Sequence, residues 1–141
     1  MTGLEQFHLY AGETLMECQR IEHDVKLMYA GMKNGDFNRN IAEVKIQPLG
    51  TVLIDLQALD NSDGRPSLSA EDYALLHEIK NVRNWLAHKA YLDFMSASGE
   101  ALERGFAKSF AKLSEFRLRI KRLGDVVEKV RLSILKKYGR I

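Results

Sequence analysis

Residues 99–138 read GEALERGFAKSFAKLSEFRLRIKRLGDVVEKVRLSILKKY, and the apolar residues of this stretch recur mostly at steps of three and four. They are Phe106, Phe110, Leu113, Ile120, Leu123, Val127, Val130, Ile134 and Tyr138. Such spacing gathers apolar side chains on one face of an α-helix. The stretch therefore predicts a long amphipathic helix that begins near Gly99 or Glu100 and runs to about Lys137. Gly105 and Gly124 weaken this helix locally, because glycine is a poor helix former.

A second long helix is predicted at the start of the chain. Thr2 and Glu5 have the spacing of a capping box, in which each side chain bonds to the backbone of the other residue. Behind them one apolar seam continues in alternating steps of four and three. Its members are Phe7, Ala11, Thr14, Cys18, Ile21, Val25, Met28 and Met32. We expect the helix to end between Gly31 and Gly35, where a glycine can cap it.

Two further helices are predicted between the long ones. Pro48 suits a first helical turn, and the apolar face that follows it stops at residues 60–66. Ser69 suits a helix cap, and the apolar seam behind it continues toward Phe94 and ends at residues 96–99. Residues 37–47 have a mixed pattern, which we interpret as a connection with room for a short helical piece. The sequence therefore predicts an all-α fold, a four-helix up-and-down bundle with long first and last helices.

Length and composition fit one helical domain over residues 1–141. The chain is 45% hydrophobic and 28% charged with only two prolines, which is typical of a folded helical protein. It has neither an apolar run of about 20 residues for a membrane span nor an export signal, so we expect a cytoplasmic protein. Its single cysteine, Cys18, is expected to be a buried thiol. The four histidines are scattered, so we expect no metal and no other cofactor.

Charge is distributed unevenly along the chain. Residues 104–141 contain twelve Lys and Arg against three acids, a net charge of +9, whereas the rest of the chain carries −7. A basic surface of this kind can bind a polyanion, because neutralising phosphates releases counterions. The alternative is a solvated helix face that partly pairs with the acidic remainder.

Three strong hydrogen-bonding residues, Arg83, Asn84 and His88, stand within six positions of the predicted third helix. Asn84 and His88 are four residues apart and share a face, whereas Arg83 and His88 diverge by about 140°. One copy of this cluster makes an incomplete site. Two copies related by a two-fold axis could bring Arg and His from both chains around one groove.

These residue types suit metal-independent cleavage of RNA. An imidazole can serve as a general base or acid near neutral pH, and a guanidinium can hold a phosphate and stabilise its transition state. A base would activate the ribose 2′-hydroxyl for attack on the phosphate, and an acid would protonate the departing 5′-oxygen. Asn84 could orient His88 or donate a hydrogen bond to the phosphate.

The cluster also resembles a known family motif. Arg83, Asn84 and His88 are similar to the Arg-x(4–6)-His signature of HEPN domains, in which a polar residue commonly follows the Arg. Residues 19–22 (QRIE), residues 48–53 (PLGTVL) and the basic last helix extend the resemblance over essentially the whole chain. The resemblance implies a homodimer through the third helix, with a composite active site at the dimer interface. It implies an endoribonuclease in which Arg83 and His88 are catalytic and Asn84 is the adjacent polar residue.

HEPN proteins of this kind are toxins of toxin–antitoxin pairs, antiviral defence factors or RNA-processing factors. HEPN toxins paired with nucleotidyltransferase antitoxins often have a Tyr two residues after the His. Here that position is Ala90, and Tyr91 follows one residue later. An antitoxin protein is thus a possible partner, but modification of that Tyr is not supported by the motif.

Three residues near the motif are secondary candidates. Lys89 and Tyr91 could contact RNA, the alternatives being an exposed lysine and a core aromatic like Trp85. Glu22 could reach Arg83 and position it, the alternative being a solvated or intrahelical carboxylate. The rival function is a non-catalytic, HEPN-like dimeric interaction module that binds a partner protein or a nucleotide.

Overall fold

The computed structural model describes residues 1–141 and contains six α-helices and no β-strand. The helices are α1 (Gly3–Met32), α2 (Phe37–Lys45), α3 (Leu49–Asn61), α4 (Ala70–His88), α5 (Leu92–Met95) and α6 (Gly99–Lys137). The all-α prediction is confirmed, but the chain forms six helices where four were expected. None of them combines the length and the apolar character that crossing a lipid bilayer requires.

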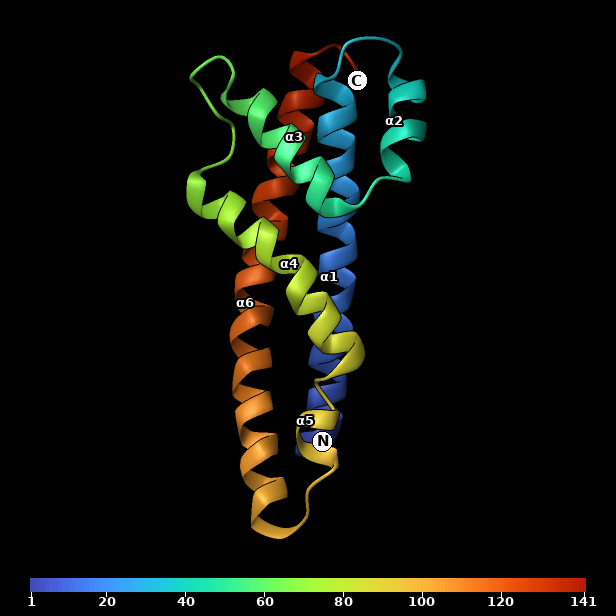
Figure 1. The fold of residues 1–141 in the computed structure, drawn as a ribbon. Coiled ribbons are helices and arrows are strands. Elements are labelled where there is room, and N and C mark those ends of the chain that lie inside the picture. The colour runs from blue at the N-terminus through green and yellow to red at the C-terminus, as the bar shows by residue number, and fades with distance from the viewer.

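The two longest helices, α1 and α6, lie side by side and run in the same direction (Figure 1). Ion pairs join them at matching heights. Arg117 Nε donates to Glu13 Oε2 at 2.7 Å, and Arg131 Nε lies 3.4 Å from Asp24 Oδ1. Residue numbers rise together along both helices, so the packing is parallel. An up-and-down order of four helices would make the first and last helices antiparallel, so that part of the prediction is wrong; the chain between α1 and α6 returns to the starting end before α6 begins.

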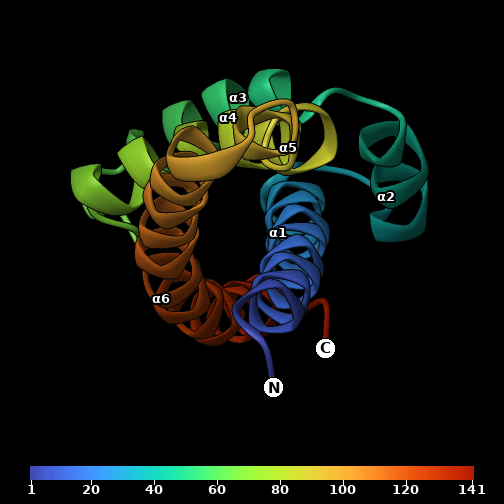
Figure 2. The ribbon, with the colours of Figure 1, turned by 90° about the horizontal axis from the view of Figure 1, so that it is seen from below.

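The remaining helices complete a second layer. Seen along the long axis, α3, α4 and α5 cover one side of the α1–α6 pair, and α2 lies at the edge beside α1 (Figure 2). A core of 27 buried hydrophobic residues draws on all six helices. The core is aromatic at the lower end of the molecule, which is the end that holds the N-terminus and α5 in Figure 1. There the centre of the Phe7 ring lies 5.4 Å from that of Phe94 and 5.8 Å from that of Phe106.

A buried carboxylate fixes the connection between α3 and α4. Asp60 is 3% exposed and accepts hydrogen bonds from the backbone N–H groups of Ser67 and Leu68, at 2.8 and 3.2 Å. It also accepts the hydroxyl proton of Tyr73 at 2.7 Å. Burial, and then the bond to Asp60, raises the pKa of Tyr73, so its hydroxyl remains a donor. The last residues of this loop are thereby tied to the end of α3.

Local sequence signals explain most helix ends. The capping boxes of Thr2 with Glu5 and of Ser69 with Asp72 are both formed. In the region interpreted as a connection, the side chain of Asp36 caps α2, which is nine residues long. Gly105 does not interrupt α6, and an added Cβ there would lie 3.1 Å from the carbonyl oxygen of Asp93. The missing side chain lets α5 approach α6 closely.

The third predicted helix is shorter than expected, because α4 ends at His88. At Lys89 the backbone leaves the helical conformation, with φ −127° and ψ −28°. The N–H of Ala90 then donates to the carbonyl oxygen of Trp85 at 2.7 Å, five residues back rather than four. The motif residues therefore occupy the last turns of α4, and His88 is the final helical residue.

Tertiary packing accounts for this break. Trp85 Nε1 donates to Asp93 Oδ2 at 2.9 Å, which bridges the end of α4 and the start of α5. The turn also buries Phe94, which is 3% exposed, against Phe7. Apolar burial of one aromatic side chain is worth about 1.5–3 kcal/mol. That gain stabilises the turn.

Close packing of α6 against the end of α1 depends on Gly31. A Cβ at Gly31 would lie 2.6 Å from Leu135 Cδ2, and Leu135 is only 4% exposed. We expect Gly31→Ala to lower the free energy of unfolding by about 1–3 kcal/mol through overpacking. Gly12 lies in the same helix with nothing within 4 Å of an added Cβ. Gly12→Ala should therefore stabilise by about 0.5–1 kcal/mol. Urea denaturation measures the free energy of unfolding of both variants. Equal values for Gly31→Ala and Gly12→Ala would contradict the close packing at Gly31.

The thiol of Cys18 is fully buried in the α1 seam, as predicted. Burial raises the pKa of Cys18 to about 11, because the thiolate is poorly solvated there. We expect a thiol reagent at pH 8 to label the native protein roughly a thousandfold or more slowly than the denatured chain. Labelling followed by mass spectrometry measures both rates. Rapid native labelling would show that the core around Cys18 opens easily.

Candidate functional site

The last turns of α4 line an open hollow of about 550 Å³, here named the His88 hollow. It is lined by Asn81, Asn84, Trp85, His88, Lys89 and Lys112. Asn81, Asn84 and His88 share one face because they are spaced three and four residues apart on the helix. Lys112 comes from α6, which borders α4 on this side.

The polar groups of the His88 hollow are free to bind a ligand. Asn84, His88 and Lys89 are exposed, and none of their side chains forms a hydrogen bond or an ion pair within the chain. No carboxylate lines the hollow, whereas two lysines do. The site is therefore cationic, and its amide and imidazole groups are available as donors and acceptors.

Trp85 lines both this hollow and a smaller neighbour. Its ring is held by the bond to Asp93, and Lys112 Nζ lies 4.3 Å from the ring centre. The neighbour, here named the Trp85 hollow, has a volume of about 240 Å³. It is lined by Glu78, Asn81, Val82, Trp85, Lys112 and Phe116. The two hollows share three residues and adjoin each other.

Arg83 points away from the His88 hollow. Its guanidinium donates to the carboxylate of Glu22 on α1, which also lies 3.4 Å from Lys26 Nζ. The Arg83 side chain is 33% exposed, so part of it remains at the surface. The divergence of Arg83 and His88 follows from their five-residue spacing. The chain therefore brings Asn84, His88 and Lys89 together and pairs Arg83 with Glu22 elsewhere.

Tyr91 lies apart from both the His88 hollow and the pair of Arg83 and Glu22. Its hydroxyl lies 2.7 Å from His8 Nδ1, and the two rings stack with centres 5.3 Å apart. The ring also meets Phe7 edge-on at 5.2 Å. Burial raises the pKa of Tyr91. Tyr91 thus joins the aromatic cluster at the lower end and does not line the His88 hollow.

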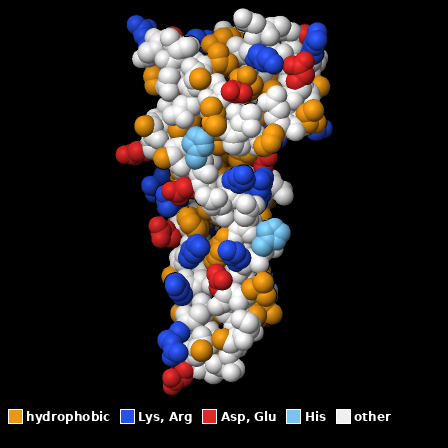
Figure 3. All heavy atoms as spheres, in the orientation of Figure 1, with side chains coloured by type: hydrophobic (Ala, Val, Ile, Leu, Met, Phe, Trp, Pro, Cys, Tyr) orange, Lys and Arg blue, Asp and Glu red, His pale blue; other side chains and the backbone are white.

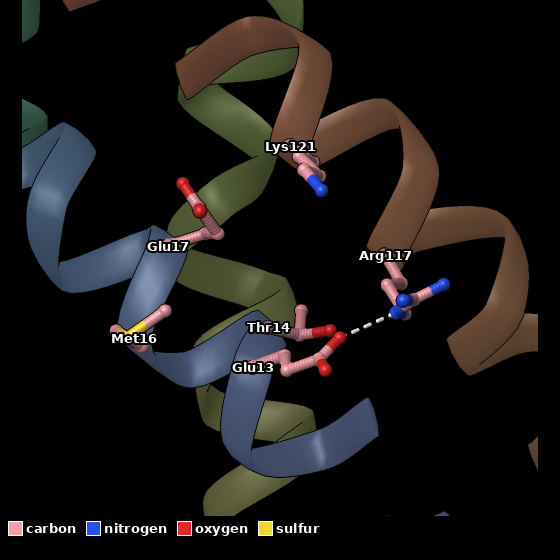
Figure 4. A pocket seen from close by; sticks show the side chains of 6 residues that line it. All are labelled: Glu13, Thr14, Met16, Glu17, Arg117 and Lys121. Atoms are coloured by element: carbon pink, nitrogen blue, oxygen red, sulfur yellow. Dashed lines mark hydrogen bonds and ion pairs between the residues drawn. The ribbon is translucent and has the colours of Figure 1, made fainter. Parts of the chain in front are cut away.

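Another hollow lies between α1 and α6, with α4 behind it in the view of Figure 4. It is lined by Glu13, Thr14, Met16, Glu17, Arg117 and Lys121. Glu13 and Arg117 bond across it, as the dashed line in Figure 4 shows. Acidic and basic side chains are mixed here, so this hollow lacks the uniform positive charge of the His88 hollow.

The basic last third of the chain is partly neutralised by the rest. Four of its basic residues pair with acids outside α6: Arg117, Arg119, Arg131 and Lys137. Lys108 and Lys112 form no ion pair, and Lys and Arg side chains gather along the lower part of the face in Figure 3. Nowhere in the chain do three or more His, Cys, Asp or Glu side chains gather as metal ligands.

Sequence reasoning did not identify every residue around the two hollows. Asn81 could have been found, because it shares the helical face of His88 at a spacing of seven. Trp85 was expected to be a core aromatic, and at 7% exposure it is one, although it also lines both hollows. Lys112 gave no local signal, since it lies far along the chain on α6. His8 was assigned no role, and only the fold brings it to Tyr91.

Comparisons with models of known protein families, with curated proteins and with solved structures gave no match to this chain.

Proposed function

We propose that this protein is a HEPN-type, metal-independent endoribonuclease that acts as a homodimer through α4. The observation that carries the proposal is the His88 hollow. There an exposed imidazole stands beside a free amide and two lysines, and no carboxylate lines the hollow. Lysines can bind the negative charge of a phosphodiester, and an imidazole can transfer the protons that its cleavage needs.

The reaction uses groups that the hollow offers. One imidazole takes the proton of the ribose 2′-hydroxyl, and the 2′-oxygen forms a bond to phosphorus. The bond from phosphorus to the 5′-oxygen breaks, and a protonated group supplies the proton that this oxygen needs. The products are a 2′,3′-cyclic phosphate end and a 5′-hydroxyl end. His88 is the general base or acid, Asn84 positions it or the phosphate, and Lys89 binds the phosphate.

Arg83 acts from the other subunit in this proposal. Its ion pair with Glu22 holds the guanidinium at the surface, turned away from its own His88. A two-fold axis near the end of α4 would place Arg83 of one chain beside His88 of the other. The guanidinium would then clamp the phosphate and stabilise its transition state.

The helical class and the long first and last helices support this assignment, although α1 and α6 run parallel, unlike the end helices of an up-and-down bundle. The four longer helices, α1, α3, α4 and α6, would correspond to the HEPN four-helix bundle, with α2 and α5 as additions. A role as a toxin, a defence factor or an RNA-processing factor in the cytoplasm follows from the same resemblance. An antitoxin protein would be a further partner.

Replacing the imidazole tests the chemistry. We expect His88→Ala to slow cleavage of single-stranded RNA by about 10²–10⁴-fold, the usual effect of losing a general base or acid. Purified protein is incubated with RNA in EDTA, and the products are analysed for 2′,3′-cyclic phosphate ends. His77 is a matched control, because it is exposed on the same helix and its side chain forms no hydrogen bond. His77→Ala should cleave at the wild-type rate.

Unchanged cleavage in His88→Ala would overturn the catalytic role of this residue. Absence of cleavage in the wild type would favour the rival function, a dimeric module that binds a partner protein or a nucleotide. In that case the pair of Arg83 and Glu22 would serve the structure alone.

Complementation tests the composite site. Arg83→Ala and His88→Ala should each be inactive, but a mixed dimer of the two retains one intact site. When both are co-expressed and pair at random, we expect about one quarter of wild-type activity, since half of the dimers are mixed and each has one site. The double variant Arg83→Ala/His88→Ala, mixed with wild type, is the control for expression and pairing. No recovery on mixing would place both residues in a site within one chain.

A further inference from the structure

We infer that the Trp85 hollow binds one unpaired nucleobase of the RNA, next to the phosphate in the His88 hollow, and that Asn81 contacts the edge of this base. The inference rests on the proposed function and adds a base-binding subsite to it, which requires an accessible base beside the cleaved bond. Three features of the two hollows carry it: their charge, their size and the groups on their shared wall.

The two hollows differ in charge. The His88 hollow has lysines and no carboxylate, whereas the Trp85 hollow includes Glu78. A phosphate is repelled by a carboxylate and attracted by lysines. The phosphate therefore belongs in the His88 hollow, and the neutral part of a nucleotide belongs in the Trp85 hollow. Glu78 pairs only weakly with Arg119, at 3.6 Å, and can accept a hydrogen bond from a base.

Size and shape also fit a single base. The volume of about 240 Å³ lies below the roughly 300–1,000 Å³ of pockets that enclose drug-sized ligands. Its walls include Trp85, Phe116 and Val82, which suit the apolar faces of a base. Paired bases cannot enter, because they are stacked within a duplex. The hollow therefore selects unpaired RNA.

The indole ring can supply a stacking surface once Lys112 moves, because Trp85 is only 7% exposed while the lysine covers its ring. The bond from Nε1 to Asp93 fixes the ring of Trp85, so no ordering of this side chain is required on binding. Lys112 Nζ occupies the place over the ring, 4.3 Å from its centre. An incoming base replaces this cation and stacks on the indole. The ammonium group then turns toward the phosphate, since Lys112 lines both hollows.

Asn81 provides the polar contact. It is exposed, its side chain forms no hydrogen bond within the chain, and it lines both hollows. An amide offers one acceptor and two donors, a combination that matches the Watson–Crick edge of a base. Asn81 is accordingly a residue that determines substrate binding rather than the cleavage step.

Trp85 is the only tryptophan of the chain, so its emission reports on the wall that the two hollows share, and a duplex that offers phosphates but no unpaired base serves as the control. The probe is a short single-stranded RNA that is 2′-O-methylated throughout and therefore cannot be cleaved. Fluorescence anisotropy of a dye on the RNA measures total binding, and Trp85 emission measures base stacking. We expect saturable quenching with the same midpoint as the anisotropy change, and no quenching with a duplex of the same sequence.

A pair of variants tests the contact with Asn81. Asn81→Ala should weaken binding of the single strand by about fivefold, the effect of one lost hydrogen bond. Asn38→Ala is the matched control, because Asn38 is an exposed asparagine on α2 whose side chain forms no hydrogen bond. It should bind as the wild type does.

The outcomes separate this inference from the proposed function. Binding by anisotropy with unchanged Trp85 emission overturns the base subsite and leaves the endoribonuclease proposal standing. Equal quenching by the duplex, or equal binding by Asn81→Ala and wild type, also overturns the subsite. Failure to bind RNA, together with failure to cleave it, overturns both.

Discussion

Parallel packing of α1 against α6 is the constraint on which the rest of the chain depends. Both helices run from the lower to the upper end of the molecule, so residues 33–98 must return the chain to the lower end (Figure 1). The helix α4 makes this return across the α1–α6 pair, and α5 closes it by burying Phe94 on Phe7. Ion pairs at matching heights and the absence of a side chain at Gly31 hold the two long helices in register.

The same constraint determines where the candidate site forms. Because α4 must stop and turn to bury Phe94, His88 becomes its last residue and stands at the rim of a hollow beside α6. The turn is fastened by Trp85, whose indole bonds to Asp93. Trp85 thereby serves the fold and lines both hollows. In the proposed function, this fixed side chain would form part of the surface that binds a flexible single strand.

Ion pairs neutralise part of the positive charge of α6. Acids of the first two thirds of the chain pair with several basic residues of α6, which accounts for part of the uneven charge seen in the sequence. The interpretation that these charges partly pair with the acidic remainder is therefore confirmed for these residues, whereas polyanion binding stays a prediction. Lys89 and Lys112 remain outside any ion pair and border the His88 hollow. Exposed pairs contribute little to stability, so the unpaired cations near α4 are the more informative ones for function.

The sequence alone determined the helical class, both long helices, the capping box of Thr2 and the cap residue Ser69, because these depend on side chains three or four residues apart. It also indicated that Asn84 and His88 share a face while Arg83 does not. Only the tertiary structure decided that α4 breaks at His88, that α1 and α6 are parallel, and that Lys112, His8 and Glu22 meet their partners. Helical periodicity reports which face is buried, but it carries no information about which helix covers that face or in which direction it runs.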